Sequence, residues 1–302
     1  MPNIAIFLVT ISAFAHAFWN LLGKRQNPST AFFFLASALA ALCLSPILFI
    51  YHEVFALIPA RVWLWVGLTS IFEAIYYIGL AGAYRHGDLS VAYPLARALP
   101  VILVALLTAI FSLGDPLSLV GAAGIFLVAI GCLLLPIRNL RQIQMDRSLV
   151  ICCLLAGLAA LGTTGYTLVD NQALFELRTA PGIGLSRIEL AFFYLALCSF
   201  TITLVVGLYI LFSPFERSEL GKTLQSGKGM AFVTGILIVG TYGLVLAAMQ
   251  YAGNVSYIAA FRQLSIPLGA ILGVLVQREA AYPIKLASIG IIFAGLVLII
   301  LA

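Results

Sequence analysis

The hydrophobic residues of this chain are gathered into long runs that short polar connections separate. Ten runs reach the length of about 17–25 residues that a helix needs to cross a hydrocarbon layer. Their approximate bounds are 3–23, 30–51, 61–84, 88–112, 117–135, 149–170, 187–212, 229–252, 254–277 and 281–302. The three longest polar connections, at about 136–148, 171–186 and 213–228, are expected to be solvated loops. The pattern predicts an all-α integral membrane protein with ten transmembrane helices and no soluble domain.

The two halves of the chain resemble each other. At an offset of 166 residues the matched pairs are Tyr76 and Tyr242, Leu80 and Leu246, Ala81 and Ala247, Gly87 and Gly253, and Ser90 and Ser256. Near the last helix of each half an acidic residue precedes a glycine by sixteen positions, as Asp115 precedes Gly131 and Glu279 precedes Gly295. Because each half has an odd number of spans, the second half must insert upside down, as in the inverted repeats of many secondary transporters. We expect one five-helix repeat over residues 1–137, an inter-repeat loop over 138–148 and a second repeat over 149–302.

Composition supports this class of protein and excludes others. Of the 302 residues 63% are hydrophobic and 9% are charged, whereas about a quarter of the residues in a soluble globule are charged. The net charge of +5 comes from basic residues scattered over the connections, so we expect no nucleic-acid partner. The five cysteines lie inside apolar runs without the spacing of metal ligands, so the sequence predicts no metal and no other cofactor.

Catalytic signatures are missing from the sequence. The dipeptide His52-Glu53 begins a zinc-helix pattern, but Ala56 stands where the second histidine is required. The stretch 221–223 imitates a phosphate loop, but Glu216 stands at the earlier glycine position. We therefore expect no enzyme, and we expect transport that runs on gradients or on exchange. An integral-membrane lipid-modifying enzyme is the alternative from another class.

Two arginines lie deep inside predicted spans. Arg97 is about nine residues, or ~13 Å, into the fourth helix, and Arg262 is ~12 Å into the ninth. A hydrocarbon core is ~30 Å thick, so both lie near its midplane, where a charge costs at least roughly 3 kcal/mol and usually marks a pathway or site. Guanidinium groups suit phosphate, phosphonate or carboxylate groups through paired hydrogen bonds. We interpret the pair as an anion-binding site, and a structural role is the alternative.

Glu73 and His16 are the candidates for coupling transport to protons. Glu73 is about twelve residues into the third span, where a carboxyl group could carry a proton or pair permanently with Arg97. His16 stands on the first helix, and an imidazole titrates close to neutral pH, as a proton relay requires. A satisfied packing contact is the alternative for His16.

Further side chains are expected to line a central cavity because they fall on helices that face the centre. Aromatic rings with a polar group can pack a substrate and hydrogen-bond to it, and plain core packing is the alternative for each. With the two arginines, the substrate-binding candidates are Trp19, Tyr76, Tyr93, Tyr242, Tyr257 and Gln263. Tyr166 is expected to face the same centre, whereas Asp170, at the end of the sixth span, is interpreted as a boundary residue. Pro94 and Pro267 are expected to kink the fourth and ninth helices.

Three features resemble a known superfamily. They are the stretch Ala13-Phe14-Ala15-His16-Ala17-Phe18-Trp19-Asn20 running to Lys24, the stretch from Tyr84 to Pro94, and the acidic residue followed by a glycine-punctuated last helix in each half. Over its whole length the chain is similar to a ten-helix member of the drug/metabolite transporter superfamily with two EamA-type repeats. Such relatives export amino acids, amphipathic drugs and other metabolites, or exchange sugar phosphates and nucleotide sugars. In the phosphate-exchanging relatives basic residues on the fourth and ninth helices hold the anion, and Arg97 and Arg262 resemble them.

The leading hypothesis is a secondary active transporter, an exporter or exchanger, that moves a small metabolite such as an organic anion by alternating access. An exporter of amino acids or of aromatic or cationic amphiphilic drugs is the alternative. The expected partners are the small-molecule substrate and the lipid bilayer of a bacterial inner membrane, with the protein a monomer or homodimer. Loops after odd-numbered spans hold eleven basic residues and those after even-numbered spans hold three, so the positive-inside rule predicts both termini outside. The habit of the superfamily favours both termini inside.

Overall fold

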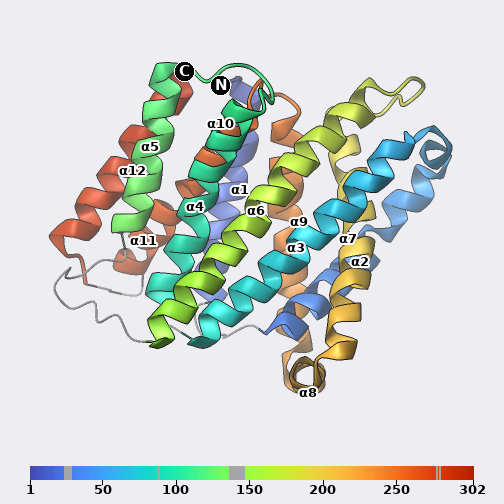
Figure 1. The fold of residues 1–302 in the computed structure, drawn as a ribbon, viewed down its shortest axis with the longest axis horizontal. Helices are drawn as coiled ribbons and strands as arrows, with labels where there is room; N and C mark the ends of the chain where they lie inside the picture. Colours follow the sequence, from blue (N-terminus) through green and yellow to red (C-terminus); the bar gives the residue numbers. More distant parts are fainter. Residues whose placement is uncertain (24–28, 87–88, 136–146, 277, 279) are drawn as a thin grey trace.

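The computed structural model describes residues 1–23, 29–86, 89–135, 147–276, 278 and 280–302, and the side chains of residues 18–23 and 89–94 lie outside this description. Every element in the described part is helical (Figure 1). The helices are α1 (Asn3–Gly23), α2 (Thr30–Ile50), η1 (His52–Leu57), α3 (Ala60–His86), α4 (Leu89–Ile110), α5 (Leu119–Leu134), α6 (Arg147–Thr179), α7 (Arg187–Phe212), α8 (Pro214–Lys222), η3 (Thr223–Gly227), α9 (Lys228–Met249), α10 (Val255–Phe261), η4 (Arg262–Leu264), α11 (Ser265–Leu275) and α12 (Pro283–Leu301).

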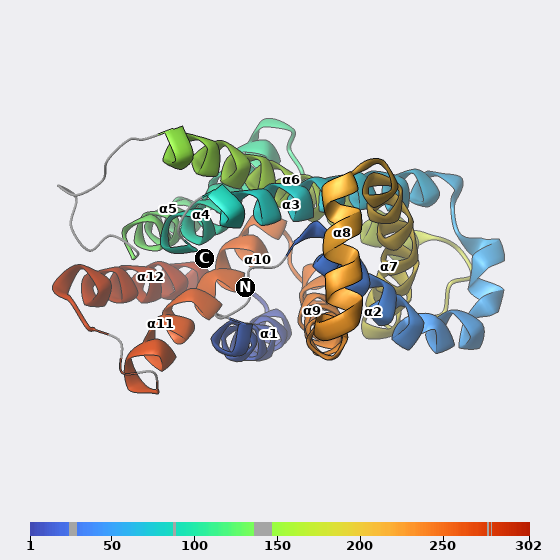
Figure 2. The same ribbon diagram turned by 90° about the horizontal axis from the view of Figure 1, so that it is seen from below.

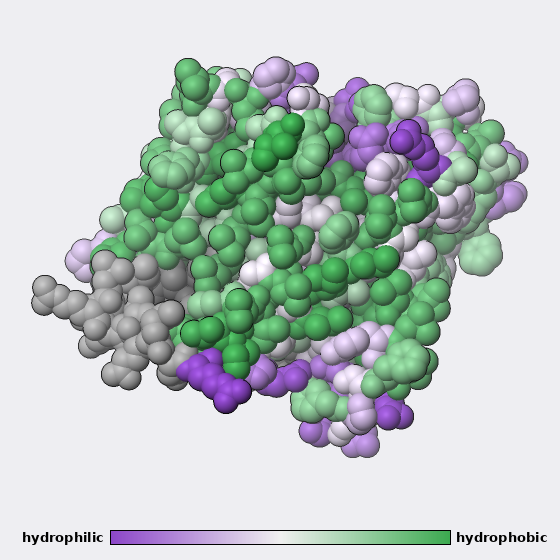
Figure 3. All heavy atoms as spheres, in the orientation of Figure 1, coloured by the Kyte–Doolittle hydropathy of each residue, from purple (hydrophilic) through white to green (hydrophobic). Residues whose placement is uncertain are grey.

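The described helices account for ten apolar segments. Seven are long and apolar enough to cross a membrane, and three shorter apolar helices, at Asn3–Ala17, Leu95–Ile110 and Leu119–Leu134, bring the number to ten. Hydrophobic residues cover most of the visible face in Figure 3, and hydrophilic residues gather mainly near its upper and lower edges. Helices with such an apolar surface satisfy their backbone groups internally, as lipid requires. The predicted all-α membrane fold is confirmed.

Two of the predicted loops are wrong in extent. The sixth span does not end at residue 170, because α6 continues to Thr179 and buries Ala173, Leu174 and Leu177 on one face. The predicted loop over 213–228 is helical, because α8, η3 and α9 form one segment from Pro214 to Met249. Ser213 caps this segment by accepting the backbone N–H of Glu216 at 3.3 Å, and proline is favoured at the first position of a helix. Both of these helical stretches contain polar residues, so the pattern of apolar runs did not predict them.

The ninth span is broken, as Pro267 predicts. Its two α-helices, α10 and α11, are joined by the 3-10 turn η4, which covers the position four residues before Pro267. A proline inside a helix removes one backbone hydrogen bond and its ring clashes with the carbonyl four residues back. The side chain of Ser265 donates to the carbonyl of Arg262 at 3.1 Å and so satisfies one group at the break. The side chain of Pro94 lies outside the description.

Helix packing in the two halves follows one pattern. The helix α5 packs against α12, and α2 packs against α7. The helix α3 packs against α6, and their counterparts in the other half, α9 and α1, also pack against each other (Figure 2). Where α5 meets α12, a Cβ on Gly131 would lie 3.1 Å from the carbonyl oxygen of Ser288, and one on Gly295 would lie 2.7 Å from that of Gly124. Gly131 and Gly295 are 164 positions apart, and so are Gly124 and Ser288, so each contact is the counterpart of the other in the second half. The packing is therefore consistent with two five-helix repeats.

The two ends of the chain lie at the same end of the bundle (Figure 1). The terminal amine of Met1 donates to the carbonyl of Ile300 at 3.4 Å. The helix α1 starts at this end and α6, its counterpart in the second half, starts at the opposite end (Figure 1). The opposite directions of α1 and α6 match the inversion expected when each half has five spans.

Candidate functional site

A small cavity lies between four helices, two from each half of the chain. Glu73 of α3 lines it, and the hydroxyl of Tyr77 donates to Oε1 of Glu73 at 2.8 Å. The hydroxyl of Ser37 in α2 lies 3.5 Å from the hydroxyl of Tyr77. The full lining consists of Ala36, Ser37, Ala40, Glu73, Tyr77, Leu195, Ser199, Gly235, Ile238, Val239 and Tyr242. The cavity is therefore mainly apolar, with one carboxylate and a few hydroxyl groups.

Asp170 is a second carboxylate at the centre of the bundle, and its interpretation as a boundary residue is wrong. Only 2% of it is exposed. Its Oδ1 accepts hydrogen bonds from the hydroxyls of Thr69 at 2.6 Å and Tyr194 at 2.7 Å, and its Oδ2 accepts one from the hydroxyl of Tyr242. Because α6 continues for about two and a half turns beyond Asp170, the residue lies within the packed bundle and not at its edge.

Three tyrosines connect the neighbourhoods of the two carboxylates. The ring of Tyr166 lies edge-to-face against that of Tyr76, with centroids 5.9 Å apart, and against that of Tyr242 at 5.5 Å. The guanidinium of Arg262 lies 5.2 Å from the centroid of the Tyr242 ring, within the range of a cation–π interaction. The structure therefore places these three tyrosines and Arg262 next to one another.

Arg97 reaches the same part of the ninth span as Arg262. Its Nη2 donates to Oγ of Ser265 at 3.1 Å, directly after the 3-10 turn that contains Arg262. His16 of α1 is close enough to interact electrostatically with both arginines. The structure thus brings Arg97, Arg262 and His16 together from three helices of the two halves.

The acidic and basic groups of the centre lie within electrostatic reach of one another. Glu73 interacts with both Asp170 and Arg262, and Asp170 also interacts with Arg262. The ion pairs found among described residues join Arg85 to Glu216 and Lys222 to Glu219. A direct ion pair between Glu73 and Arg97, the structural alternative from the sequence, is not among them.

Of the four remaining candidates from the sequence, two do not join this cluster. The hydroxyl of Tyr257 accepts the backbone N–H of Ser118 at 3.2 Å, and its ring fills the space beside Gly121, so it anchors the start of α5. Gln263 is buried and donates from Nε2 to the carbonyl of Ala259 at 3.0 Å, which supports the broken helix. The side chains of Trp19 and Tyr93, the other two, lie outside the described residues.

Some residues of the cluster were not predicted from the sequence. Thr69, Tyr194 and Asp170 belong to three different helices and share no motif or spacing. One signal was available for Asp170, because the residues that follow it are good helix formers with apolar positions three and four apart. Extending the sixth helix on that basis would have placed this carboxylate at depth.

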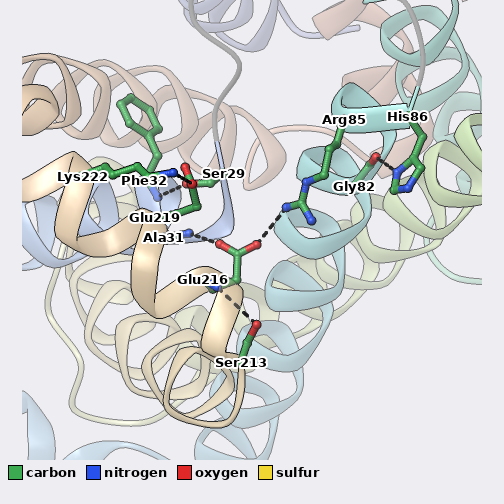
Figure 4. Close-up of polar contacts among 10 residues, drawn as sticks. All are labelled: Ser29, Ala31, Phe32, Gly82, Arg85, His86, Ser213, Glu216, Glu219 and Lys222. Carbon is green, nitrogen blue, oxygen red and sulfur yellow. Dashed lines mark hydrogen bonds and ion pairs between the residues drawn. The ribbon is translucent and has the colours of Figure 1, made fainter.

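Contacts between the two halves lie at both ends of the bundle. At one end Glu216 forms an ion pair with Arg85 and accepts the backbone N–H of Ala31 (Figure 4). At the other end the backbone N–H of Asp115 donates to the carbonyl of Gly253 at 2.8 Å, and the amide of Asn254 donates to the carbonyl of Asp115 at 2.7 Å.

Comparisons with known proteins agree with this architecture. None of the curated proteins matches the chain. A crystal structure of another protein matches with a TM-score of 0.72 at 18% sequence identity, and the match covers 100% of this chain and 98% of the other, so the two share a fold. Residues 3–137 match the sequence profile of the EamA-like transporter family. Over these residues the chain therefore belongs to a family of membrane transporters, the EamA-like transporter family.

Proposed function

We propose that this protein is a secondary active transporter of small zwitterionic metabolites of the amino-acid type, working by alternating access. One observation carries the proposal. Tyr242 lines the central cavity together with the carboxylate of Glu73, and the guanidinium of Arg262 lies over the ring of Tyr242. A carboxylate and a guanidinium group therefore lie near one aromatic side chain inside the membrane-spanning part of the protein.

This arrangement is complementary to a substrate that carries both signs of charge. A carboxylate of the substrate would take paired hydrogen bonds from Arg262 or Arg97, and its ammonium group would face Glu73. The tyrosine rings supply flat apolar surfaces with hydroxyl groups, which suit an aromatic or aliphatic side chain. Charged residues inside a membrane are costly, so they pair with one another or mark a site or pathway for a charged substrate.

A second candidate is an organic anion, as the pair of arginines suggests. Arg97 donates to Ser265 beside the turn that contains Arg262, and His16 is within electrostatic reach of both arginines. Three nitrogen groups around one point would favour phosphate or a dicarboxylate. Glu73 and Asp170 lie close enough to Arg262 to offset part of this positive charge, which is why we place the anion second.

The energy source and setting follow from the same reasoning. We propose that transport is coupled to protons through Glu73 or His16, or runs as exchange of one substrate for another. The helical spans would place the protein in a bacterial inner membrane rather than an outer membrane, whose proteins are β-barrels. Export by a monomer or homodimer is the expected mode.

Thermal stabilisation of the purified protein tests the substrate class. A ligand at about 100 times its Kd stabilises the folded state by ~2.7 kcal/mol, which raises the melting temperature measurably. The panel contains phenylalanine and leucine, their decarboxylated amines, their deaminated acids, and sugar phosphates. Stronger stabilisation by the intact amino acids than by either truncated form supports the proposal. Stabilisation by phosphates or by the deaminated acids instead would show that the substrate is an organic anion and would overturn the proposal of a zwitterionic substrate.

A further inference from the structure

We propose that Asp170 is a positioning residue, which holds the phenol of Tyr242 in the cavity and thereby sets the affinity of the site. The inference rests on the proposed function, because it takes the cavity lined by Tyr242 to be the substrate site. Asp170 itself does not line the cavity. It acts through the hydrogen bond between its Oδ2 and the hydroxyl of Tyr242.

The two oxygens of Asp170 have different surroundings. Oδ1 accepts from Thr69 of α3 and Tyr194 of α7, which are 1% and 0% exposed. These two donors come from opposite halves of the chain and share Oδ1, so the loss of one leaves the other to hold the carboxylate. Oδ2 is then directed at Tyr242, which belongs to α9 and is the only one of the three donors that borders the cavity.

Fixing the hydroxyl of Tyr242 also fixes its ring. A tyrosine has two side-chain torsions, so a restraint at the hydroxyl removes most of the remaining freedom of the ring. The edge of Tyr166 meets this ring and the guanidinium of Arg262 lies over its face. Loss of the bond to Asp170 would therefore loosen the ring that borders the cavity and the arginine that rests on it.

A carboxylate suits this role better than a neutral group. Hydrogen bonds to a charged acceptor are roughly twice as strong as neutral ones, and an ionised carboxylate can accept three donors without offering any of its own. An asparagine in place of Asp170 would keep one acceptor oxygen and turn two N–H donors toward hydroxyl groups. The Asp170→Asn variant therefore weakens the hydrogen bond to the hydroxyl of Tyr242 with little change in side-chain volume.

A double-mutant cycle tests the proposal. Binding of radiolabelled phenylalanine is measured for the wild type, Asp170→Asn, Tyr242→Phe and the double variant. Each single change should weaken binding by about tenfold, and the double variant should bind no more weakly than either single variant, because both remove the same bond. Effects that multiply in the double variant would show that Asp170 does not act through Tyr242, and the proposal would fall.

Tyr194→Phe is the matched control. It removes a second tyrosine hydrogen bond from the same carboxylate, but Tyr194 does not line the cavity. We expect a lower melting temperature with phenylalanine affinity within about twofold of wild type. Loss of affinity as large as that of Tyr242→Phe would mean that any damage to the Asp170 network weakens binding, which would overturn a specific role for Tyr242.

A ligand-free measurement separates this proposal from the proposed function. Ser37 lines the same cavity, so a Ser37→Cys thiol can report on access to it, in a background where the exposed Cys43 is changed to serine. Asp170→Asn should change the rate of alkylation of this thiol by more than about threefold, and should change it no further once Tyr242 is phenylalanine. If phenylalanine fails to bind the wild type, the proposed substrate is wrong, yet this rate still decides the positioning role. An unchanged rate in Asp170→Asn would overturn it.

Discussion

Arg85 and Glu216 form an ion pair that joins the two halves of the chain, with 3.0 Å between Nη2 of Arg85 and Oε1 of Glu216 (Figure 4). The partners differ in exposure, since the side chain of Glu216 is 3% exposed and that of Arg85 is 43% exposed. Oε2 of Glu216 accepts the backbone N–H of Ala31 at 2.9 Å, in the first turn of α2. A single carboxylate therefore ties the end of α3 and the start of α2 to α8.

The unequal burial predicts unequal effects of mutation. Arg85→Ala leaves a buried carboxylate without its cation and should lower stability by about 2–4 kcal/mol, whereas in Glu216→Gln the arginine turns to solvent and the loss should be about 1–2 kcal/mol. The double variant should resemble Glu216→Gln alone. Thermal unfolding in detergent measures all three. A double variant less stable than Arg85→Ala would contradict this account.

The contact between α5 and α12 predicts a sharp response to one methyl group. A Cβ on Gly295 would lie 2.7 Å from the carbonyl oxygen of Gly124, which is backbone and cannot turn away. We expect Gly295→Ala to lower stability by about 1–3 kcal/mol. Gly290 lies in the same helix with no atom within 4 Å of such a Cβ, so Gly290→Ala should be neutral or stabilising by about 0.5–1 kcal/mol. Equal melting temperatures for the two variants would refute the close approach.

Arg262 is expected to bind the carboxylate of the substrate. Arg262→Ala should weaken phenylalanine binding by about tenfold or more while leaving the decarboxylated amine nearly unaffected, because only the former presents an anion. Arg97→Lys keeps the charge but loses the planar fork, so affinity should fall while some binding survives. Calorimetric titration with the two ligands measures this difference. Equal losses for both ligands would remove Arg262 from carboxylate recognition.

Glu73 is the first candidate for proton coupling, because it borders the cavity whereas Asp170 does not. In liposomes with a pH gradient, Glu73→Gln should abolish uphill transport of phenylalanine, and exchange of labelled for unlabelled substrate should continue. His16→Asn in parallel tests the second candidate. If both variants concentrate substrate as the wild type does, neither residue couples transport to protons.

Basic residues predict how the protein lies in the membrane. The connections after odd-numbered spans hold eleven of the sixteen lysines and arginines, and those after even-numbered spans hold three, so both termini should face away from the cytoplasm. The proximity of Met1 to Ile300 requires only that the two termini share a side. A reporter active only outside the cytoplasm, fused after Ala302, should be active. Activity of a cytoplasmic reporter at that position would reverse the orientation.

The sequence by itself determined the features that depend on local patterns. Runs of apolar residues of membrane length predicted the ten helical segments, because lipid contact imposes such runs on each span separately. Pro267 predicted the break in the ninth span, since its effect acts on the turn that precedes it. The spacing of Gly131 and Gly295 indicated the repeat that appears in the packing of α5 on α12. Helices with polar residues inside them, such as α8 and the end of α6, escaped the same search.

Only the tertiary structure decided which side chains meet. Asp170 finds its donors on α3, α7 and α9, and Glu216 finds its partners on α2 and α3, at separations of up to 185 residues. No spacing along the chain encodes such contacts, because they depend on the rotation and tilt with which each helix packs against its neighbours. For the same reason Tyr257, on a predicted inward-facing helix, packs against the start of α5, while Tyr166 joins the central cluster.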